Sequence, residues 1–79
     1  MNETALMEQL EEVFRKVFFD DAIELRREHT AIDIGGWDSL SHVRLIMAME
    51  RHFSIALAAS EVAGLHDVGA LADLIAAKQ

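Results

Sequence analysis

Asp38, Ser39 and Leu40 begin a helix-like apolar pattern directly after Gly36 and Trp37, the only tryptophan of the chain. Aspartate is a preferred residue at a helix N-cap, so the two polar residues have a structural use at this place. They also put a hydroxyl where another group can be attached, because a serine at the first helical position points outward. This stretch is therefore the first candidate for chemistry.

Hydrolysis by these residues is excluded on geometric grounds. Ser39 and His42 can touch on a helix, but so small a chain has no evident orienting group or oxyanion hole for a triad with Asp38. The histidines lack metal-ligand spacing, and we expect all four at the solvated surface: His29, His42, His52 and His66. Because cysteine is absent, no thiolate can bind a metal. The sequence predicts no catalytic residue and no metal site.

Length and charge narrow the class of protein further. The 79 residues suffice for one small domain, spanning 1–79, which suits a binding or carrier module better than a complete enzyme. The net charge of −7 repels phosphate backbones, so we expect no nucleic-acid partner. No apolar stretch reaches the roughly 18 residues of a membrane span, and the start lacks a secretory signal. These features predict a cytoplasmic protein.

Helical periodicity predicts the two longest elements. The first covers residues 4–19, with one apolar face formed by Leu6, Leu10, Val13, Phe14, Val17 and Phe18. The second runs from Ser39 to about His52, with a buried stripe formed by Leu40, Val43, Ile46, Met47, Met49 and Phe53. We expect Val43 to be half buried.

The rest of the chain predicts a loop and two further helices. Residues 20–38 lack a hairpin turn signal, so we expect a long loop with a short turn near residues 21–25, closed over the helices by Trp37. Residues 60–64 predict one helical turn, and Asp67 caps a last helix whose inner face holds Val68, Leu71, Ala72, Leu74 and Ile75. The expected fold is an all-α four-helix bundle of three longer helices and one short helix.

The tripeptide Asp38-Ser39-Leu40, at a helix start near mid-chain, resembles the attachment motif of acyl carrier proteins. Alone it is a weak signal, but the resemblance covers nearly the whole chain. It includes Thr30-Ala31-x-Asp33-Ile34 in the loop, Phe53-x-Ile55-x-Leu57 in the connector and Val68-x-x-Leu71-x-x-Leu74-Ile75 in the last helix. In this position and with these flanks, the tripeptide is a strong signal for that family.

The resemblance implies that a phosphopantetheinyl transferase moves 4′-phosphopantetheine from coenzyme A onto Ser39. The thiol of this arm then carries an acyl group as a thioester between acyl-loading and acyl-transferring enzymes. The lack of cysteine fits, since the thiol is imported. The phosphodiester would lie beside the unpaired N–H groups of the helix start, which favour an anion. Asp38, by the same resemblance, also helps the transferase to hold its metal ion and coenzyme A.

The partner interface is expected on the second helix, at Leu40, Val43, Arg44, Met47 and Arg51. Carriers of fatty-acid synthesis usually present a strongly acidic second helix to basic patches on their enzymes. Here residues 39–53 hold one acid, Glu50, against two arginines, while residues 1–38 hold ten acids and four bases. Because rim charges set partner choice, we expect a specialised stand-alone carrier, monomeric, in a lipid, cell-surface or secondary-metabolite pathway.

Two other functions remain open from the sequence. An aminoacyl or peptidyl carrier has the same fold and the same chemistry at Ser39, and differs in its loading enzyme. An unmodified acidic helical adaptor uses Asp38 and Ser39 only as a helix start. Modification by a transferase separates the adaptor from the carriers, and loading assays separate the two carriers.

Overall fold

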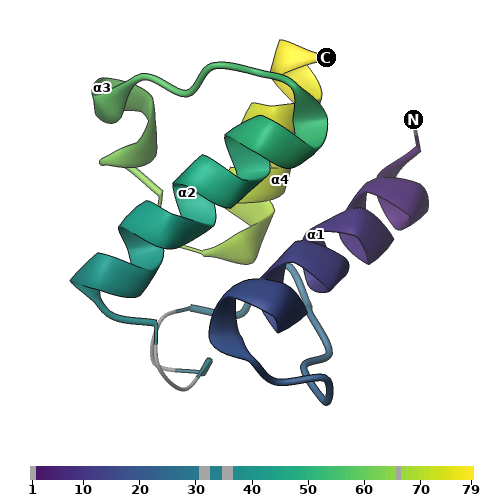
Figure 1. Ribbon diagram of the computed structural model, residues 1–79. Helices are drawn as coiled ribbons and strands as arrows, with labels where there is room; N and C mark the ends of the chain where they lie inside the picture. The colour runs from purple at the N-terminus through teal and green to yellow at the C-terminus, as the bar shows by residue number, and fades with distance from the viewer. Residues whose placement is uncertain (1, 31–32, 35–36, 66) are drawn as a thin grey trace.

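The computed structural model describes residues 2–30, 33–34, 37–65 and 67–79, and the regular structure within these ranges is entirely helical. The helices are α1 (Glu3–Phe18), α2 (Ser39–Phe53), α3 (Ala59–Val62) and α4 (Val68–Lys78). They surround a common core, and a long connection separates α1 from α2 (Figure 1). The predicted all-α bundle of three longer helices and one short helix is confirmed.

Each of the three longer helices begins at a polar cap. The side chains of Asn2, Asp38 and Asp67 each accept a backbone N–H three residues further on, at 2.8 Å, and so satisfy one otherwise unpaired donor. At the other end, α1 and α2 stop at Phe19 and Ser54, whose φ values of 53° and 55° are left-handed. The first helix, predicted at about residues 4–19, is therefore confirmed, with its bounds shifted by one residue to Glu3–Phe18.

The core lies mainly where α1, α2 and α4 meet. Figure 1 shows α1 and α2 side by side and running in opposite directions. The largest fully buried side chains are Phe14, Leu10, Leu45, Met49, Leu71, Ile75 and Val68. Burial of each such side chain contributes about 1.5–3 kcal/mol relative to leaving it exposed, so these residues hold the helices together.

The buried face of α2 differs from the predicted stripe. The side chains of α2 that enter the core are Leu45, Ile46, Met49 and Phe53. Leu40, Val43 and Met47 are instead 60%, 54% and 57% exposed, so their predicted burial, including half-burial of Val43, is wrong. At 3.6 residues per turn, α2 carries apolar residues on two opposite faces. Packing against α1 and α4 buries the face that contains Met49 and leaves the opposite face in solvent.

The first half of the long loop is fixed to α1 by its backbone. Ile23 and Leu25 are partly buried against the core, and Ile34 is buried within it. The N–H of Leu25 donates to Glu11 Oε2 and the Nε of Arg15 donates to the carbonyl of Ile23, both at 2.9 Å. A turn at residues 21–22 agrees with the prediction.

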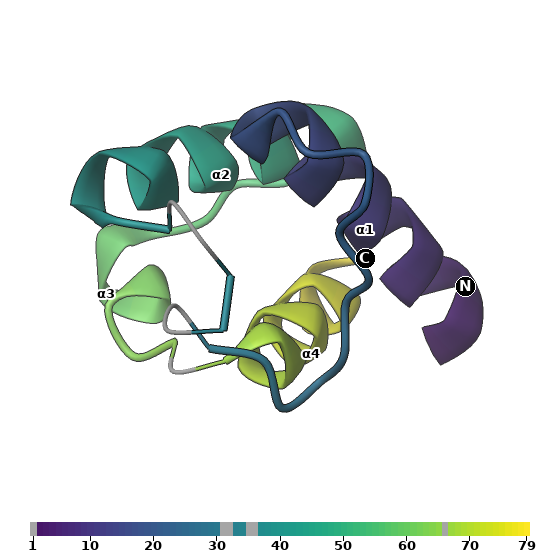
Figure 2. The same cartoon turned by 90° about the horizontal axis from the view of Figure 1, so that it is seen from below.

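The second half of the loop is fixed to α4. The first two N–H groups of α4 donate to the carbonyls of His29 and Arg27, each at 2.9 Å. The guanidinium of Arg27 pairs with Glu3 of α1 and, at 2.8 Å, with Asp73 of α4. Figure 2 shows this segment passing along α4. The loop thus holds α1 and α4 together.

The short helix α3 is joined to α4 by one carboxylate. Glu61 accepts the N–H of Ala58 at 2.9 Å and the Nζ of Lys78 at 2.7 Å, and the contact with Lys78 is the main cause of the lowered pKa of Glu61. Because Glu61 caps the backbone at Ala58, the helix occupies Ala59–Val62. It therefore begins one residue before the predicted 60–64.

A pair of leucines on α2 tests which face is buried. Leu45→Ala removes a side chain with 0% exposure, so we expect a loss of about 2–5 kcal/mol in the free energy of unfolding. Leu40→Ala, at 60% exposure, is the matched control and changes the free energy by no more than about 0.5 kcal/mol. Urea unfolding followed by circular dichroism measures both. Equal losses would contradict the assignment of the two faces.

Candidate functional site

Ser39 is the first residue of α2, and its side chain is exposed at the end of the helix where backbone N–H groups point outward. Its hydroxyl makes no hydrogen bond to the described residues. The backbone of Asp38 is extended, with φ −106° and ψ −173°, so the helix begins directly at Ser39. The hydroxyl is therefore free and accessible on a rigid element.

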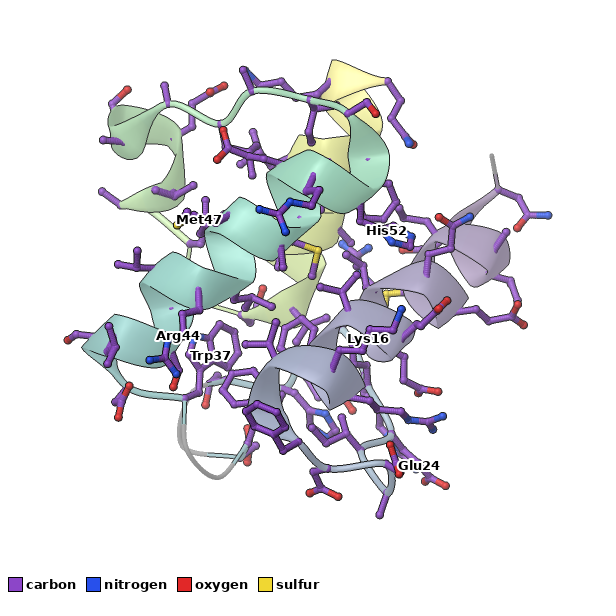
Figure 3. The ribbon with its side chains drawn as sticks, viewed as in Figure 1. Lys16, Glu24, Trp37, Arg44, Met47 and His52 are labelled. Carbon is purple, nitrogen blue, oxygen red and sulfur yellow. The ribbon has the colours of Figure 1, made fainter. Side chains whose placement is uncertain are left out.

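An aromatic cluster holds the chain immediately before this serine. The ring of Trp37 packs edge-on against Phe14, with centroids 5.4 Å apart, and also contacts Phe18. Its Nε1 donates to Nδ1 of His42 at 3.1 Å, and the two rings stack at 18°. Figure 3 shows Trp37 between α1 and the start of α2. Trp37 is thus the packing anchor that the sequence predicted.

The electrostatics at the start of α2 favour a negative charge. The carboxylate of Asp38 accepts the N–H of Ser41 at 2.8 Å. This hydrogen bond, with a further one from the Ser41 hydroxyl, holds the pKa of Asp38 below its ordinary value. The partial positive charge of the helix N-terminus acts on any anion in the same way. A phosphodiester at this end of the helix has a suitable environment.

Next to Ser39, α2 presents to solvent what we call the outward face, formed by Leu40, Val43, Arg44, Met47 and Arg51. All five residues predicted as partner interface are exposed, and they lie together because their spacing of three or four residues follows one side of a helix. Figure 3 shows Arg44 and Met47 projecting from α2. The face is apolar and cationic.

An apolar pocket of about 230 Å³ lies between α2 and α3, beside the outward face. Its lining residues are His42, Val43, Ile46, Met47, Leu57, Ala59 and Val62. His42 and Val43 are one helical turn from Ser39, so a flexible group rooted at the serine lies within reach of the pocket. This pocket was not predicted from the sequence, because it depends on how α3 packs against α2.

Comparison with known proteins gives the family. The family model described as "Phosphopantetheine attachment site" matches residues 5–75. The chain belongs to the phosphopantetheine-attachment family of acyl carrier proteins. A solved relative is the holo acyl carrier protein of Geobacter metallireducens, whose solution NMR structure superposes with a TM-score of 0.87 at 48% identity, over 92% of this chain and 84% of that one. No curated protein matches the chain.

This membership has direct consequences. Proteins of the family are carriers and have no catalytic activity of their own, and they bear a covalently bound phosphopantetheine. The carrier therefore works with a phosphopantetheinyl transferase and with biosynthetic enzymes. An exposed serine at the positive end of a helix fits the requirement of the arm for a free hydroxyl and for an environment that accepts a phosphodiester.

The histidines only partly follow the prediction. His52 is exposed, but His42 is half buried and bonded to Trp37, and His29 is half buried and accepts the N–H of Arg26 at 3.2 Å. The expectation of a solvated surface position is therefore wrong for His42 and His29, because their rings form hydrogen bonds with the nearby residues Trp37 and Arg26. His66 lies outside the described residues, as do Ile32 and the glycines 35–36.

Two features are absent from the described part of the chain, which comprises residues 2–30, 33–34, 37–65 and 67–79. No helix there is both long enough and apolar enough to cross a bilayer. No group of three or more histidine, aspartate or glutamate side chains there is arranged to hold a metal ion.

Substitutions of Asp38 test the cap and its charge. Asp38→Ala removes the acceptor for Ser41 N–H, so we expect a lower urea midpoint at pH 7, whereas Asp38→Asn keeps an equally good cap and serves as control. The pKa of Asp38 is lowered on folding, so its negative charge stabilises the folded protein. This stabilisation is complete above the unfolded pKa of about 3.9, and it is lost as the pH falls through the folded pKa.

The measurement is urea unfolding of the three proteins between pH 7 and pH 2.5. The difference between wild type and Asp38→Ala should narrow at the acidic end of this range. An unchanged midpoint for Asp38→Ala at pH 7 would mean that the hydrogen bond to Ser41 does not stabilise the start of α2.

Proposed function

We propose that this carrier holds its phosphopantetheine on Ser39 and passes acyl groups, as thioesters on the arm, between enzymes. The observation that carries the proposal is the free, exposed hydroxyl of Ser39 at the first position of α2, within a chain that matches the attachment family over residues 5–75. On this proposal, residues 1–79 act as one carrier domain.

The proposed reaction transfers phosphopantetheine from coenzyme A to Ser39. Ser39 Oγ forms an ester bond to the phosphorus that bears the pantetheine, the pyrophosphate bond of coenzyme A breaks, and 3′,5′-ADP and the hydroxyl proton are released. The charged product then lies beside the N-terminus of α2, which favours it. Asp38 is negatively charged at neutral pH, as aspartate ordinarily is, and the hydrogen bonds from Ser41 lower its pKa further. On this proposal the carboxylate helps the transferase to bind its metal ion.

Docking is proposed to use the outward face of α2. Leu40, Val43 and Met47 are large apolar side chains more than half exposed, and exposed methionine suits contacts with several different partners. Ser39 begins the same helix, so an enzyme that docks here lies next to the root of the arm. A monomer in the cytoplasm fits this arrangement, because the face must remain open to successive enzymes.

A specialised pathway is proposed over housekeeping fatty-acid synthesis. The only acid of α2, Glu50, is directed toward the connector after α2, where its carboxylate accepts the N–H of Leu57 at 3.0 Å, and it is not one of the residues of the outward face. Enzymes that recognise an acidic second helix therefore find arginines in its place. Lipid, cell-surface or secondary-metabolite assembly is the class of pathway that this surface favours.

An acyl cargo is favoured over an aminoacyl cargo by the pocket between α2 and α3. Its walls are nearly all aliphatic, and Val43 and Met47 join it to the outward face. Burial of a hydrocarbon chain gains about 0.8 kcal/mol for each CH₂, whereas the ammonium of an aminoacyl group loses solvation in such a pocket. Carriage of an aminoacyl or peptidyl group remains the alternative.

Ser39→Ala tests the attachment residue. Incubation with coenzyme A and a broad-specificity phosphopantetheinyl transferase should add one phosphopantetheine to the wild type and none to Ser39→Ala, as measured by intact-mass spectrometry. Ser60→Ala is the matched control, because Ser60 is also exposed and also lies in the first turn of a helix. Modification of Ser39→Ala, or loss of modification in Ser60→Ala, would contradict the assignment.

Loading assays test the class of cargo. The holo carrier is offered to fatty-acyl and to aminoacyl adenylating enzymes, and thioester formation is read by mass. We expect acyl thioesters of medium chain length to form and to raise the melting temperature of the carrier, because the chain covers apolar pocket surface. Loading by the aminoacyl enzymes alone would establish the alternative function.

A further inference from the structure

The basic side chains of this acidic protein are distributed unevenly. The chain has 14 acids and 7 bases, and most of the bases are neutralised locally by ion pairs to carboxylates. The paired bases are Arg15, Lys16, Arg27 and Lys78. Within the described residues no ion pair is formed by Arg26, Arg44 or Arg51. Two of these three unpaired cations lie on the outward face of α2.

The outward face also lacks a carboxylate of its own. Glu50 is the only acid of α2, and its side chain is half buried against the connector, where it accepts the N–H of Leu57. Arg44 and Arg51 lie seven residues apart, two turns along the same side of the helix, with Met47 between them. The charge that a partner meets on this face is therefore positive.

A groove between α1 and α2 extends this positive surface. Its volume is about 230 Å³, and its apolar lining consists of Val13, Val17 and Ala48. Its basic lining consists of Lys16, Arg51 and His52, so Arg51 belongs to the groove and to the outward face. Figure 3 shows Lys16 and His52 where α1 and α2 lie side by side. Lys16 pairs with Glu12 at 3.2 Å, but Arg51 has no such partner among the described residues.

We infer that the enzyme which docks on this carrier presents an acidic surface with an apolar side chain at its centre. Carboxylates of the partner pair with Arg44 and Arg51, and the apolar side chain enters the groove or covers Met47. The inference rests on the proposed carrier function, and it names the chemistry of the partner. Charge complementarity supports it, because the face carries two arginines with no ion pair to any described residue, in a protein whose net charge is −7.

Two variants with equal net charge distinguish the effect of the cations on the outward face from the effect of the overall charge on binding. Arg44→Gln combined with Arg51→Gln and the single change Arg26→Glu both take the formal net charge from −7 to −9. Arg26 is exposed and unpaired among the described residues, but it lies in the loop between α1 and α2. All three side chains are at the surface, and circular dichroism checks that the variants fold.

The probes are two synthetic helical peptides of equal length that share a leucine stripe, one carrying glutamates and the other lysines. Each is titrated into the ¹⁵N-labelled holo carrier at low and at high salt. We expect the acidic peptide to shift the amide signals of Leu40, Arg44, Met47 and Arg51, with affinity falling at high salt. The double variant should bind about 3- to 10-fold more weakly, and Arg26→Glu should bind like the wild type.

Three results would overturn the inference: preferred binding of the lysine peptide, amide shifts confined to other elements, or equal weakening by Arg26→Glu. The attachment of the arm is read separately, by intact mass. A carrier that gains phosphopantetheine and yet prefers the lysine peptide disproves only the acidic partner. A carrier that gains no phosphopantetheine disproves the proposed function.

Discussion

The packing of Trp37 against Phe14 is the contact on which the site depends. It joins the last residues of the loop to the most deeply buried aromatic side chain of α1, and so fixes where the chain enters α2. Asp38 and Ser39 follow immediately, and the hydrogen bond from Ser41 completes the start of the helix. Because the other contacts of the loop to α1 and α4 involve residues 23–29, Trp37 is the anchor next to the serine.

The same arrangement separates the two tasks of α2. One side, with Leu45 and Met49 fully buried, holds the helix against the core, and the other side leaves Leu40 and Met47 in solvent. Exposure of large apolar groups is costly for solubility but useful for docking. A rigid helix that carries the attachment residue at one end and a docking face along its length gives partners a fixed geometry, while the arm itself stays mobile.

Much of the fold was predictable from residue spacing alone. The apolar repeats of α1 and α4, the caps at Asp38 and Asp67, and the all-helical class follow from local rules that act within one or two turns. The family resemblance followed from the position of Asp38-Ser39-Leu40 and its flanks. The sequence thus determined the class of protein and the candidate for attachment, because both follow from residue types at fixed positions along the chain.

Tertiary structure decided what the spacing left ambiguous. α2 has apolar residues on opposite sides, and only contact with α1 and α4 determines that Met49 is buried and Met47 exposed. The pocket against α3 and the groove against α1 that includes Arg51 likewise depend on segments far apart in sequence. Local propensity contains no information on such contacts, because they form only when the helices pack together.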